Sequence, residues 1–292
     1  MKTSIDKART LVEALPYIQS FRDAVVVIKY GGSTMEEKQN SDNILTDLTF
    51  MSCVGMRPVI VHGGGKAISR RMKEAGLQAR FVKGLRVTDE AAIAIVHEVI
   101  QTVINPEIVA SLKAKGARAR GIRGEDVFQV VKRVEKDPQT GETLDWGFVG
   151  EIQAVNDDLI QACFRAGEIP VITPLGRGAD GHLYNLNADD AAAAAAKALK
   201  ARKLAFLSDV PGLLRDPQDE NSIISTLRVR DVEGLVKDGI IDGGMLPKIR
   251  SAVDALQSGV RKVHLIDGRL PHSLLLEIYT DAGVGTEIIQ ND

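Results

Sequence analysis

The chain has 292 residues, of which 44% are hydrophobic and 26% are charged. This hydrophobic content is enough to build a folded core and excludes an intrinsically disordered chain, and the length suits about two domains or one large α/β unit. Lys and Arg number 37 against 39 Asp and Glu. The net charge of −2 therefore predicts neither nucleic acid nor an anionic membrane as a partner.

The two cysteines, Cys53 and Cys163, are too few for a disulfide-rich scaffold or a Cys-rich zinc site. No continuous apolar run reaches the roughly 20 residues of a membrane span. Residues 1–21 interleave charged and apolar positions too closely for a signal peptide. A cytoplasmic location is therefore expected.

The first half of the chain alternates short strand-like blocks with helical patterns. Strands are expected over 25–28 and 58–61, a helix over 36–54 lies between them, and a second helix covers 68–75. This order predicts a right-handed βαβ unit. An N-terminal helix is expected within residues 1–22, because apolar residues recur there at helical spacing: Ile5, Ala8, Leu11, Val12, Leu15 and Ile18.

The middle of the chain predicts a helix and then a hairpin. Thr88, followed by two acidic residues, is typical of a helix start in which the threonine hydroxyl caps the helix. We expect this helix to reach Asn105, where Pro106 breaks or kinks it. Segments 127–131 and 147–150 flank the polar residues 137–141, which predicts a β-hairpin inserted into the α/β chain.

The second half returns to alternation, with strands expected over 169–172, 204–207 and 263–266 and helices over 188–202, 246–257 and 273–279. No linker rich in Pro, Gly and Ser separates the halves. We therefore expect two lobes that share one continuous sheet.

Three familiar signatures fail. Gly65-Lys66 lacks the earlier glycine of a P-loop, and His97-Glu98 has no second histidine at metalloprotease spacing. Residues 176–181 match G-x-G-x-x-G, but no helical pattern follows. They predict a turn rather than a dinucleotide site.

Two glycine-rich segments end predicted strands: Lys29-Tyr30-Gly31-Gly32-Ser33 and His62-Gly63-Gly64-Gly65. Parallel sheets bind ligands at these carboxyl ends, and successive glycines let backbone N–H groups approach a phosphate. Each segment alone is equally typical of a tight turn. Together with Lys29, they favour an anion site.

Two later segments have both an ordinary and a functional interpretation. Residues 185–190 are typical helix-capping residues, but they also allow Asp189 to hold the lysines in position. Lys248 follows a glycine turn in the first turn of a helix, where a cation is disfavoured unless an anion lies nearby. Such a local conflict is typical of a functional site.

In chain order, Lys29-x-Gly-Gly, His62-Gly-Gly-Gly, Arg86-Val-Thr-Asp, Asn185-x-Asn-Ala-Asp and Gly243-Gly-Met-x-x-Lys248 resemble the amino acid kinase family over about residues 10–290. The resemblance implies a three-layer αβα sandwich around a mainly parallel sheet, with the hairpin as an insertion. It implies an N-terminal helix at 1–22 for oligomerisation and regulation, an acceptor-binding lobe at 23–185 and a nucleotide-binding lobe at 186–292.

The resemblance also implies a reaction, in which ATP with Mg²⁺ phosphorylates a side-chain carboxylate. The motifs at 86–89 and 185–189 are the more specific ones, and they imply N-acetyl-L-glutamate as the acceptor, in arginine biosynthesis. Because a carboxylate is ionised at neutral pH, such a kinase needs no general base. Mg²⁺ would be held by nucleotide phosphates and water, so no protein metal ligand is expected.

Site residues follow from the matched motifs. Lys29 and Lys248 would flank the transferring phosphoryl group as catalytic residues, with Asp189 orienting both. The N–H groups of Gly31, Gly32 and Gly64 would bind phosphate. Gly64, Gly65, Arg86 and Asn185 would hold the acceptor, with Arg86 on its α-carboxylate. The nucleotide pocket would be lined by Asp209, Gly212, Leu213, Leu214, Gly243, Gly244 and Met245.

The two ends of the chain resemble arginine-inhibited members of the family, in which an N-terminal helix links dimers into a hexamer. The resemblance implies a homohexamer and L-arginine as an inhibitor, bound by Tyr17, Glu277 and Gly285. The alternative is that the helix folds back on its own domain. A nitrogen-signalling PII protein is a further partner that the residues leave undecided. Lys66 departs from the family, which usually has an uncharged residue there.

Two other functions stay open. The chain could act on another acceptor, such as glutamate, aspartate, carbamate or a nucleoside monophosphate, although Arg86 and the motif at 185–189 argue against this. It could instead be an arginine-sensing or partner-binding protein without catalysis. Intact Lys29, Asp189 and Lys248 argue against that interpretation.

Overall fold

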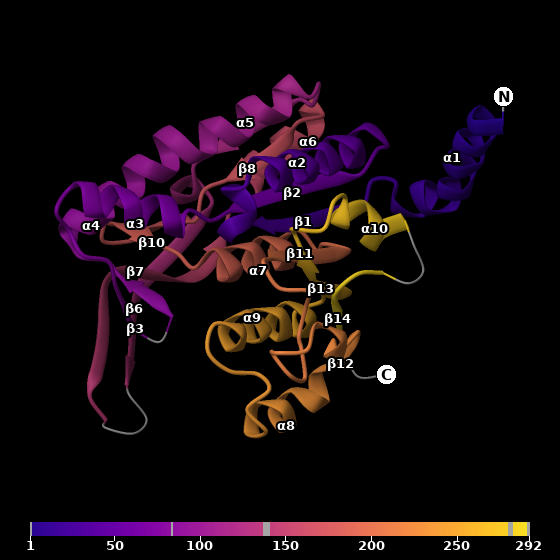
Figure 1. The fold of residues 1–292 in the computed structure, drawn as a ribbon. Coiled ribbons are helices and arrows are strands. Elements are labelled where there is room, and N and C mark those ends of the chain that lie inside the picture. Colours follow the sequence, from indigo (N-terminus) through magenta and orange to yellow (C-terminus); the bar gives the residue numbers. More distant parts are fainter. Residues whose placement is uncertain (1, 83, 137–140, 280–282, 291–292) are drawn as a thin grey trace.

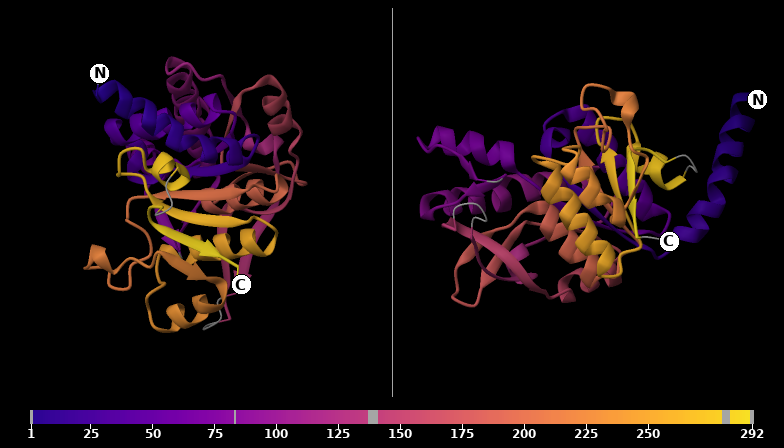
Figure 2. Two further views of the ribbon diagram at one scale, coloured as in Figure 1. Left: turned by 90° about the vertical axis from the view of Figure 1, so that its right-hand side faces the viewer. Right: turned by 90° about the horizontal axis from the view of Figure 1, so that it is seen from below.

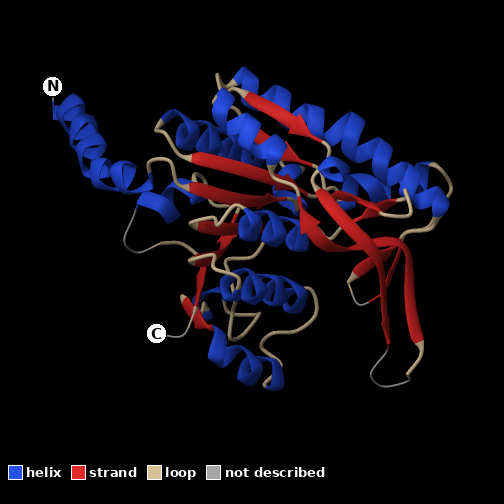
Figure 3. Ribbon diagram, turned by 180° about the vertical axis from the view of Figure 1, so that it is seen from behind, coloured by secondary structure: helices blue, strands red, loops and turns tan. Residues whose placement is uncertain are grey.

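The computed structural model describes residues 2–82, 84–136, 141–279 and 283–290 (Figure 1). Among these residues, eight strands form one sheet in the order β12-β14-β13-β11-β1-β2-β8-β5. Its neighbouring strands are parallel except β13 and β14, which are antiparallel. Helices cover both faces (Figure 3). The expected three-layer αβα sandwich around a mainly parallel sheet is confirmed.

The strands of this sheet are β1 (Val25–Tyr30), β2 (Arg57–His62), β5 (Ala119–Ile122), β8 (Ile169–Ile172), β11 (Lys203–Ser208), β12 (Thr226–Arg228), β13 (Lys262–Asp267) and β14 (Thr286–Ile289). The α-helices are α1 (Lys2–Phe21), α2 (Lys38–Cys53), α3 (Gly65–Glu74), α4 (Glu90–Glu98), α5 (Asn105–Ala114), α6 (Asp158–Ala166), α7 (Ala188–Ala198), α8 (Val232–Lys237), α9 (Met245–Gln257) and α10 (Ser273–Tyr279).

Alternation along β1 divides the core into two layers. Val27 belongs to the layer under α6, α7 and α9, whereas its neighbours Val26 and Ile28 belong to the layer under α2, α3, α5 and α10. Successive side chains of a strand point to opposite faces, so a strand buried on both faces is apolar throughout. This is why the sheet strands read as continuous apolar runs in the sequence.

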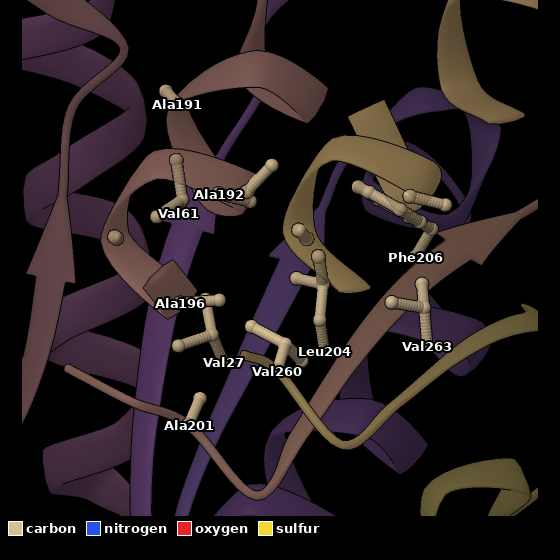
Figure 4. Packing of buried hydrophobic residues seen from close by; sticks show 14 of the residues in the cluster. Val27, Val61, Ala191, Ala192, Ala196, Ala201, Leu204, Phe206, Val260 and Val263 are labelled. Atoms are coloured by element: carbon tan, nitrogen blue, oxygen red, sulfur yellow. The ribbon is translucent and has the colours of Figure 1, made fainter. Parts of the chain in front are cut away.

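The alanine-rich helix α7 packs directly on the sheet. Ala191, Ala192 and Ala196 are fully buried beside Val27 and Val61 of β1 and β2 (Figure 4). Alanine favours the helical conformation and lets the helix axis approach closely. This packing places the first turn of α7 at the carboxyl ends of β1 and β2, where the two glycine-rich segments begin.

Both halves of the chain contribute to the same sheet. β1 pairs with β2 on one side and with β11, from the second half, on the other. The prediction of one continuous sheet is therefore confirmed. The lobe boundaries at residues 22 and 185 stay a prediction.

The expected hairpin is present as β6 (Phe128–Lys136) and β7 (Thr143–Val155). Residues 137–140 of its turn lie outside the described part of the chain. The hairpin forms an arm that projects from the sheet (Figure 1). Its inner part joins β9 (Leu175–Gly178) and β10 (Leu183–Asn185) in a small closed barrel, which the sequence did not predict. Residues 176–178 of this glycine motif lie in β9 and residues 179–181 in the β9–β10 turn, so its interpretation as a turn is confirmed for the second half of the motif.

One expectation near α4 is wrong, and a second holds only in part. Asp89, not Thr88, caps the helix, because its carboxylate accepts a 2.8 Å hydrogen bond from the Ala92 N–H. Thr88 is still in extended backbone, bridged to Gly147, and its hydroxyl donates to the Arg86 carbonyl. The helix reaches Asn105 as expected, and Pro106 does not break it, since α4 continues through a π-helix (Val99–Ile104) into α5. The alternative expectation of a kink at Pro106 stays a prediction. The wide π turn makes room for the proline ring.

This continuous helix, Glu90–Ala114, is long and apolar enough by length and composition to cross a membrane. Its Val96, Ile100 and Leu112 side chains are fully buried between the sheet and the neighbouring helices. The helix belongs to the protein core.

Candidate active site

Three charged side chains from distant segments meet at the carboxyl edge of the sheet. Lys29 Nζ lies 3.1 Å from Asp189 Oδ1, and Lys248 Nζ donates a 2.8 Å hydrogen bond to Asp189 Oδ2. The side chains of Lys29, Asp189 and Lys248 are only 14%, 12% and 11% exposed. The carboxylate lies between two cations and sets their separation.

Local structure explains why these groups converge. Lys29 is the next-to-last residue of strand β1, and Asp189 is in the first turn of α7. The helix cap Asn187 accepts a 2.7 Å hydrogen bond from the Asp189 N–H. Lys248 is in the first turn of α9, where a cation is locally unfavourable. The Asp189 carboxylate is the anion that offsets this cost, and the Phe206 ring lies 5.2 Å from the Lys248 amino group.

Burial alone would raise the pKa of Asp189, but Lys29 and Lys248 outweigh it and hold this pKa well below its usual range. Burial lowers the pKa of Lys248, and Asp189 opposes that effect. Two cations and one anion leave the cluster with a net positive charge. Such a site favours an incoming anion.

The two glycine-rich segments contact one another beside this cluster. A Cβ on Gly31 would lie 3.3 Å from the Lys29 side chain and 3.4 Å from Gly63. A Cβ on Gly64 would lie only 2.7 Å from Ile104 Cδ1. Gly32 has a φ of +74°, which disfavours any other residue. The structure thus brings Gly31, Gly32 and Gly64 together with Lys29.

Arg86 lies on β4 (Leu85–Val87), which pairs with β3 (Arg80–Val82) in a short hairpin. Its guanidinium donates to the Gly65 carbonyl at 2.8 Å and to Ser69 Oγ at 2.7 Å, and it stacks on Phe81. Burial lowers its pKa. Within the described residues all its hydrogen-bond acceptors are neutral, so its charge is available to an anionic ligand.

Asn185, at the end of β10, lies on the same side of the molecule as Arg86. Its amide is 3.5 Å from Thr88 Oγ1, and Thr88 in turn bonds to the Arg86 carbonyl at 3.0 Å. The predicted acceptor residues Gly64, Gly65, Arg86 and Asn185 therefore lie along one connected path.

The predicted nucleotide residues are less tightly grouped. The Asp209 charge acts on the pKa of Lys248, whereas the Leu213 side chain is buried, and its N–H donates to Thr286 at 2.8 Å. Leu214 bridges to Ile223. Gly212 and Gly243 both have positive φ, and Gly244 caps α9 before Met245.

A cleft of about 870 Å³ lies between the β6–β7 arm and helices α7 and α9 and is lined in part by Gly243 and Gly244. It is lined by Asp190 rather than Asp189. Arg133 of the arm pairs with Asp190 at 3.4 Å, and Ser251 of α9 donates to the same carboxylate at 2.5 Å. This network links the arm to both helices. Sequence reasoning missed it, because no motif connects these three positions.

Tyr17, Glu277 and Gly285 line one cavity of about 610 Å³ next to α1 and α10. Glu277 is buried there, 2.9 Å from Lys203 Nζ and 2.7 Å from His264 Nδ1. Burial would raise the pKa of Glu277, but these two groups and the Val284 N–H lower it to about 2. Lys203 and His264 were not predicted, since an isolated strand lysine or histidine carries no sequence signal.

Lys66, the departure from the family pattern, pairs with Glu36 at 3.2 Å. Both line a cavity of about 300 Å³ with Gly32, Gly64 and Gly65. Within the described residues, no group of three or more His, Cys, Asp and Glu side chains is arranged to hold a metal ion.

Comparisons with known proteins agree with this geometry. Residues 24–267 match the profile of the amino acid kinase family. The chain is 48% identical to the acetylglutamate kinase of Pelotomaculum thermopropionicum over 99% of both chains. It is 47% identical to that of Syntrophomonas wolfei over 98% of both chains and 46% identical to that of Carboxydothermus hydrogenoformans over 98% of this chain and 99% of the relative.

Solved structures of other proteins have the same fold as this chain. An N-acetylglutamate synthase from Neisseria gonorrhoeae, complexed with coenzyme A and N-acetyl-glutamate, superimposes with a TM-score of 0.83 at 27% identity. The match covers 98% of this chain and 64% of the synthase chain. An isopentenyl phosphate kinase at 18% identity, with a TM-score of 0.64 over 90% of this chain and 99% of its own, shares the fold.

The chain belongs to the amino acid kinase family. It is an enzyme of the phosphotransferase class, and the curated relatives that match it along nearly their whole length share acetylglutamate kinase activity.

Proposed function

We propose that this enzyme transfers the γ-phosphoryl group of ATP to the side-chain carboxylate of N-acetyl-L-glutamate, giving an acyl phosphate, as a cytoplasmic step of arginine biosynthesis. The observation that carries the proposal is the cluster in which Asp189 separates Lys29 from Lys248 beside two glycine-rich turns. The identity of 46–48% to acetylglutamate kinases supports this choice of acceptor.

The chemistry needs charge stabilisation more than proton transfer. The acceptor carboxylate, with a reference pKa of about 4.3, is already ionised at neutral pH. The barrier arises because this anion must approach the anionic phosphate. Lys29 and Lys248 offset the charge on the transferring phosphoryl group, and Asp189 fixes their spacing before the substrates arrive. Such preorganised charge is the main source of rate enhancement in phosphoryl transfer.

Backbone and guanidinium groups complete the proposed site. The N–H groups of Gly31, Gly32 and Gly64 donate to phosphate oxygens, and Gly65 and Asn185 contact the acceptor. Arg86 binds the α-carboxylate of the acceptor, a task that suits its planar fork and its neutral surroundings. Together these groups hold donor and acceptor in line.

The nucleotide is proposed to bind along 209–214 and 243–245. Mg²⁺ accompanies ATP and offsets part of the phosphate charge. The Asp189 carboxylate is already paired with two lysines, and the described residues offer no cluster of metal ligands. We propose that the nucleotide phosphates and water hold the ion, as is usual for Mg²⁺ that enters a site with ATP.

The nature of the product tests this proposal. An acyl phosphate reacts with hydroxylamine to give a hydroxamate, whereas a phosphate ester or a phosphorylated amine does not. Incubation with MgATP, N-acetyl-L-glutamate and hydroxylamine is expected to give one hydroxamate per ADP. ADP release without hydroxamate would place the phosphoryl group on another acceptor atom.

The 610 Å³ cavity favours a second function, feedback inhibition by L-arginine. Tyr17, Glu277 and Gly285 come from both ends of the chain yet line this one cavity. An N-acetylglutamate synthase of similar fold, at 26% identity and a TM-score of 0.80, was solved with L-arginine. In the proposal, Glu277 binds the guanidinium group and Tyr17 covers it.

Glu277→Gln is expected to raise the arginine concentration for half-inhibition by about tenfold or more, because a charge-assisted hydrogen bond becomes a neutral one. The kcat without arginine is expected to stay within about twofold of wild type. Initial rates over an arginine series measure both, with the exposed Glu233→Gln on α8 as a matched control. Unchanged inhibition in the Glu277 variant would contradict this assignment.

Acid stability gives an independent readout of the Glu277 contacts. Because its folded pKa of about 2 lies below the unfolded value of about 4.3, ionised Glu277 stabilises the fold above pH 4.3. That contribution is lost as the pH falls from about 4.3 towards 2. The Gln variant is expected to lack this part of the pH dependence in thermal melts.

Helix α1 supports a homo-oligomer, and we propose the hexamer expected from the sequence. The helix extends away from the body (Figure 2), and Tyr17 near its C-terminal end meets Tyr279 of α10 at 6.3 Å. Leu11, Val12 and Leu15 are 66%, 67% and 47% exposed. Three large apolar side chains on one exposed helix favour contact with a second copy of the chain.

Deleting residues 1–20 is expected to reduce the assembly to a smaller particle and to leave kcat within about twofold of wild type, because the helix lies away from the lysine cluster. Sedimentation velocity and turnover on the same preparations measure both effects. A sedimentation coefficient that changes only by the lost mass would contradict the linking role. The paired change Leu11→Ser and Val12→Ser tests the apolar face without shortening the chain.

A further inference from the structure

His62 and Asn105 are buried polar side chains that the proposed mechanism does not use. His62 ends strand β2 and precedes the glycine turn, and it has no exposed surface. Asn105 begins α5 directly after the π-helix and is 6% exposed. Buried polar groups are costly unless their hydrogen bonds are complete. Their partners therefore indicate what the pair accomplishes.

The hydrogen bonds of this pair fix the protonation of the imidazole. His62 Nδ1 lies 2.9 Å from the Gly63 carbonyl oxygen. Since a carbonyl only accepts, Nδ1 carries the proton. Asn105 Nδ2 lies 3.1 Å from His62 Nε2 and 2.9 Å from the Val171 carbonyl oxygen, so its two hydrogens are donated to those two acceptors. His62 Nε2 is then the acceptor.

Burial lowers the pKa of His62 to about 4, so the ring is neutral at physiological pH. A neutral ring has only one N–H, and Asn105 assigns it to Nδ1 by occupying Nε2 as a donor. The pair thus selects one tautomer out of two.

The fold holds Asn105 in this orientation from two sides. The π-helix Val99–Ile104 inserts a wide turn, which rotates the residues after it by about one helical position, roughly 100°. On the far side, a Cβ on Gly121 would lie 2.2 Å from Asn105 Oδ1. Only glycine at 121 lets β5 approach the amide this closely.

The His62 hydrogen bond orients the peptide between Gly63 and Gly64. The chain has no cis peptide bonds among the described residues, and in a trans peptide the C=O and the following N–H point in opposite directions. Fixing the Gly63 carbonyl on His62 therefore directs the Gly64 N–H away from the ring. The Gly63 N–H donates to the Tyr30 carbonyl at 2.7 Å, and this bond ties the turn to the Lys29 strand.

We propose that His62 is a positioning residue for phosphoryl transfer: as the Nδ1–H tautomer selected by Asn105, it holds the Gly63–Gly64 peptide so that the Gly64 N–H meets the transferring phosphoryl group. This inference rests on the proposed phosphate-binding role of Gly64. The series of contacts that fixes the peptide runs from Gly121 through Asn105 and His62 to the glycine turn. It acts through the backbone and does not touch the reacting atoms.

Two conservative variants separate this role from simple packing. The side-chain nitrogen of asparagine takes about the position of Nδ1, whereas that of glutamine takes about the position of Nε2. Both His62→Asn and His62→Gln remove the ring, but only the Asn variant keeps a donor for the Gly63 carbonyl.

His62→Asn is expected to keep kcat within about fivefold of wild type. His62→Gln is expected to lower kcat about 10- to 100-fold, a smaller loss than the roughly 10²- to 10³-fold that follows complete removal of an oxyanion donor. KM for both substrates is expected to change by less than about threefold, because the donor acts mainly in the transition state. Equal kcat values for two variants with similar melting temperatures would overturn the proposal.

The tautomer itself can be measured on the unmodified enzyme. The chain has five histidines, and the ¹⁵N imidazole signals of His62 are assigned in the unmodified enzyme through its own Cβ and backbone resonances. The Nδ1–H tautomer is expected at pH 7, and an Nε2–H or doubly protonated ring would overturn the proposal even if neither variant folds. This measurement needs no substrate. A wild-type enzyme inactive on N-acetyl-L-glutamate would instead contradict the proposed function and leave the tautomer result standing.

Discussion

Lys248→Ala is expected to lower kcat by about 10²- to 10³-fold, the scale found when one preorganised charge donor is removed from a transition state. The amino group lies 2.8 Å from Asp189, and we propose that it faces the charge that develops during transfer. KM for ATP is expected to stay within about threefold, because Lys29 and the glycine turns are also proposed to contact the phosphate. Steady-state kinetics with both substrates varied separates these two effects.

The Lys248 variant is expected to fold, because Lys29 remains to pair with Asp189 at 3.1 Å. A thermal melt checks this point. Lys237→Ala, on the exposed face of α8, removes the same charge from the same half of the chain without touching the site. A kcat for Lys248→Ala equal to that of this control would remove Lys248 from the mechanism.

The second large effect is expected at Arg86. Arg86→Ala removes the one guanidinium proposed to bind the α-carboxylate, and kcat/KM for N-acetyl-L-glutamate is expected to fall about 100-fold or more, as for other buried charge pairs that lose one partner. Arg86→Lys keeps the charge but loses the fork, so its loss is expected to be intermediate. KM for ATP is expected to be unchanged in both variants.

Arg80→Ala is the matched control for Arg86, because Arg80 lies on the other strand of the same hairpin and is exposed. Its kinetics are expected to match wild type. If Arg86→Ala raised KM for ATP as much as KM for the acceptor, the arginine would instead organise the nucleotide, and the acceptor assignment would be wrong.

Much of the fold could be predicted from local patterns. The apolar runs that became β1, β2, β8, β11 and β13 are buried on both faces, which gives them a strong and continuous signal. The missed strands are short or lie at sheet edges: β12 spans only Thr226–Arg228, and β5 contains the exposed Arg120 and Gly121. The wrong prediction of a cap at Thr88 and of a break at Pro106 both concern helix ends, where contacts from distant segments decide the outcome.

In the candidate site, too, some features could be predicted from local sequence and others could not. Glycine turns and a lysine at a helix start are visible in sequence, because each departs from a local rule. The pairing of Lys203 and His264 with Glu277, and of Arg133 and Ser251 with Asp190, depends on which strands and helices become neighbours. No spacing along the chain carries that information. His62 was visible only as the first residue of the glycine motif, and its partner Asn105 only as the residue before a proline.

The identity of the acceptor is the property that most directly defines the proposed function. ADP release with MgATP should be measured with N-acetyl-L-glutamate beside glutamate, aspartate, carbamate and UMP, on folded enzyme. Turnover is expected with N-acetyl-L-glutamate alone, because Arg86 and the Lys29–Asp189–Lys248 cluster are proposed to hold its two carboxylates apart. Turnover on another acceptor in its place, or no turnover with any, would contradict the proposed function.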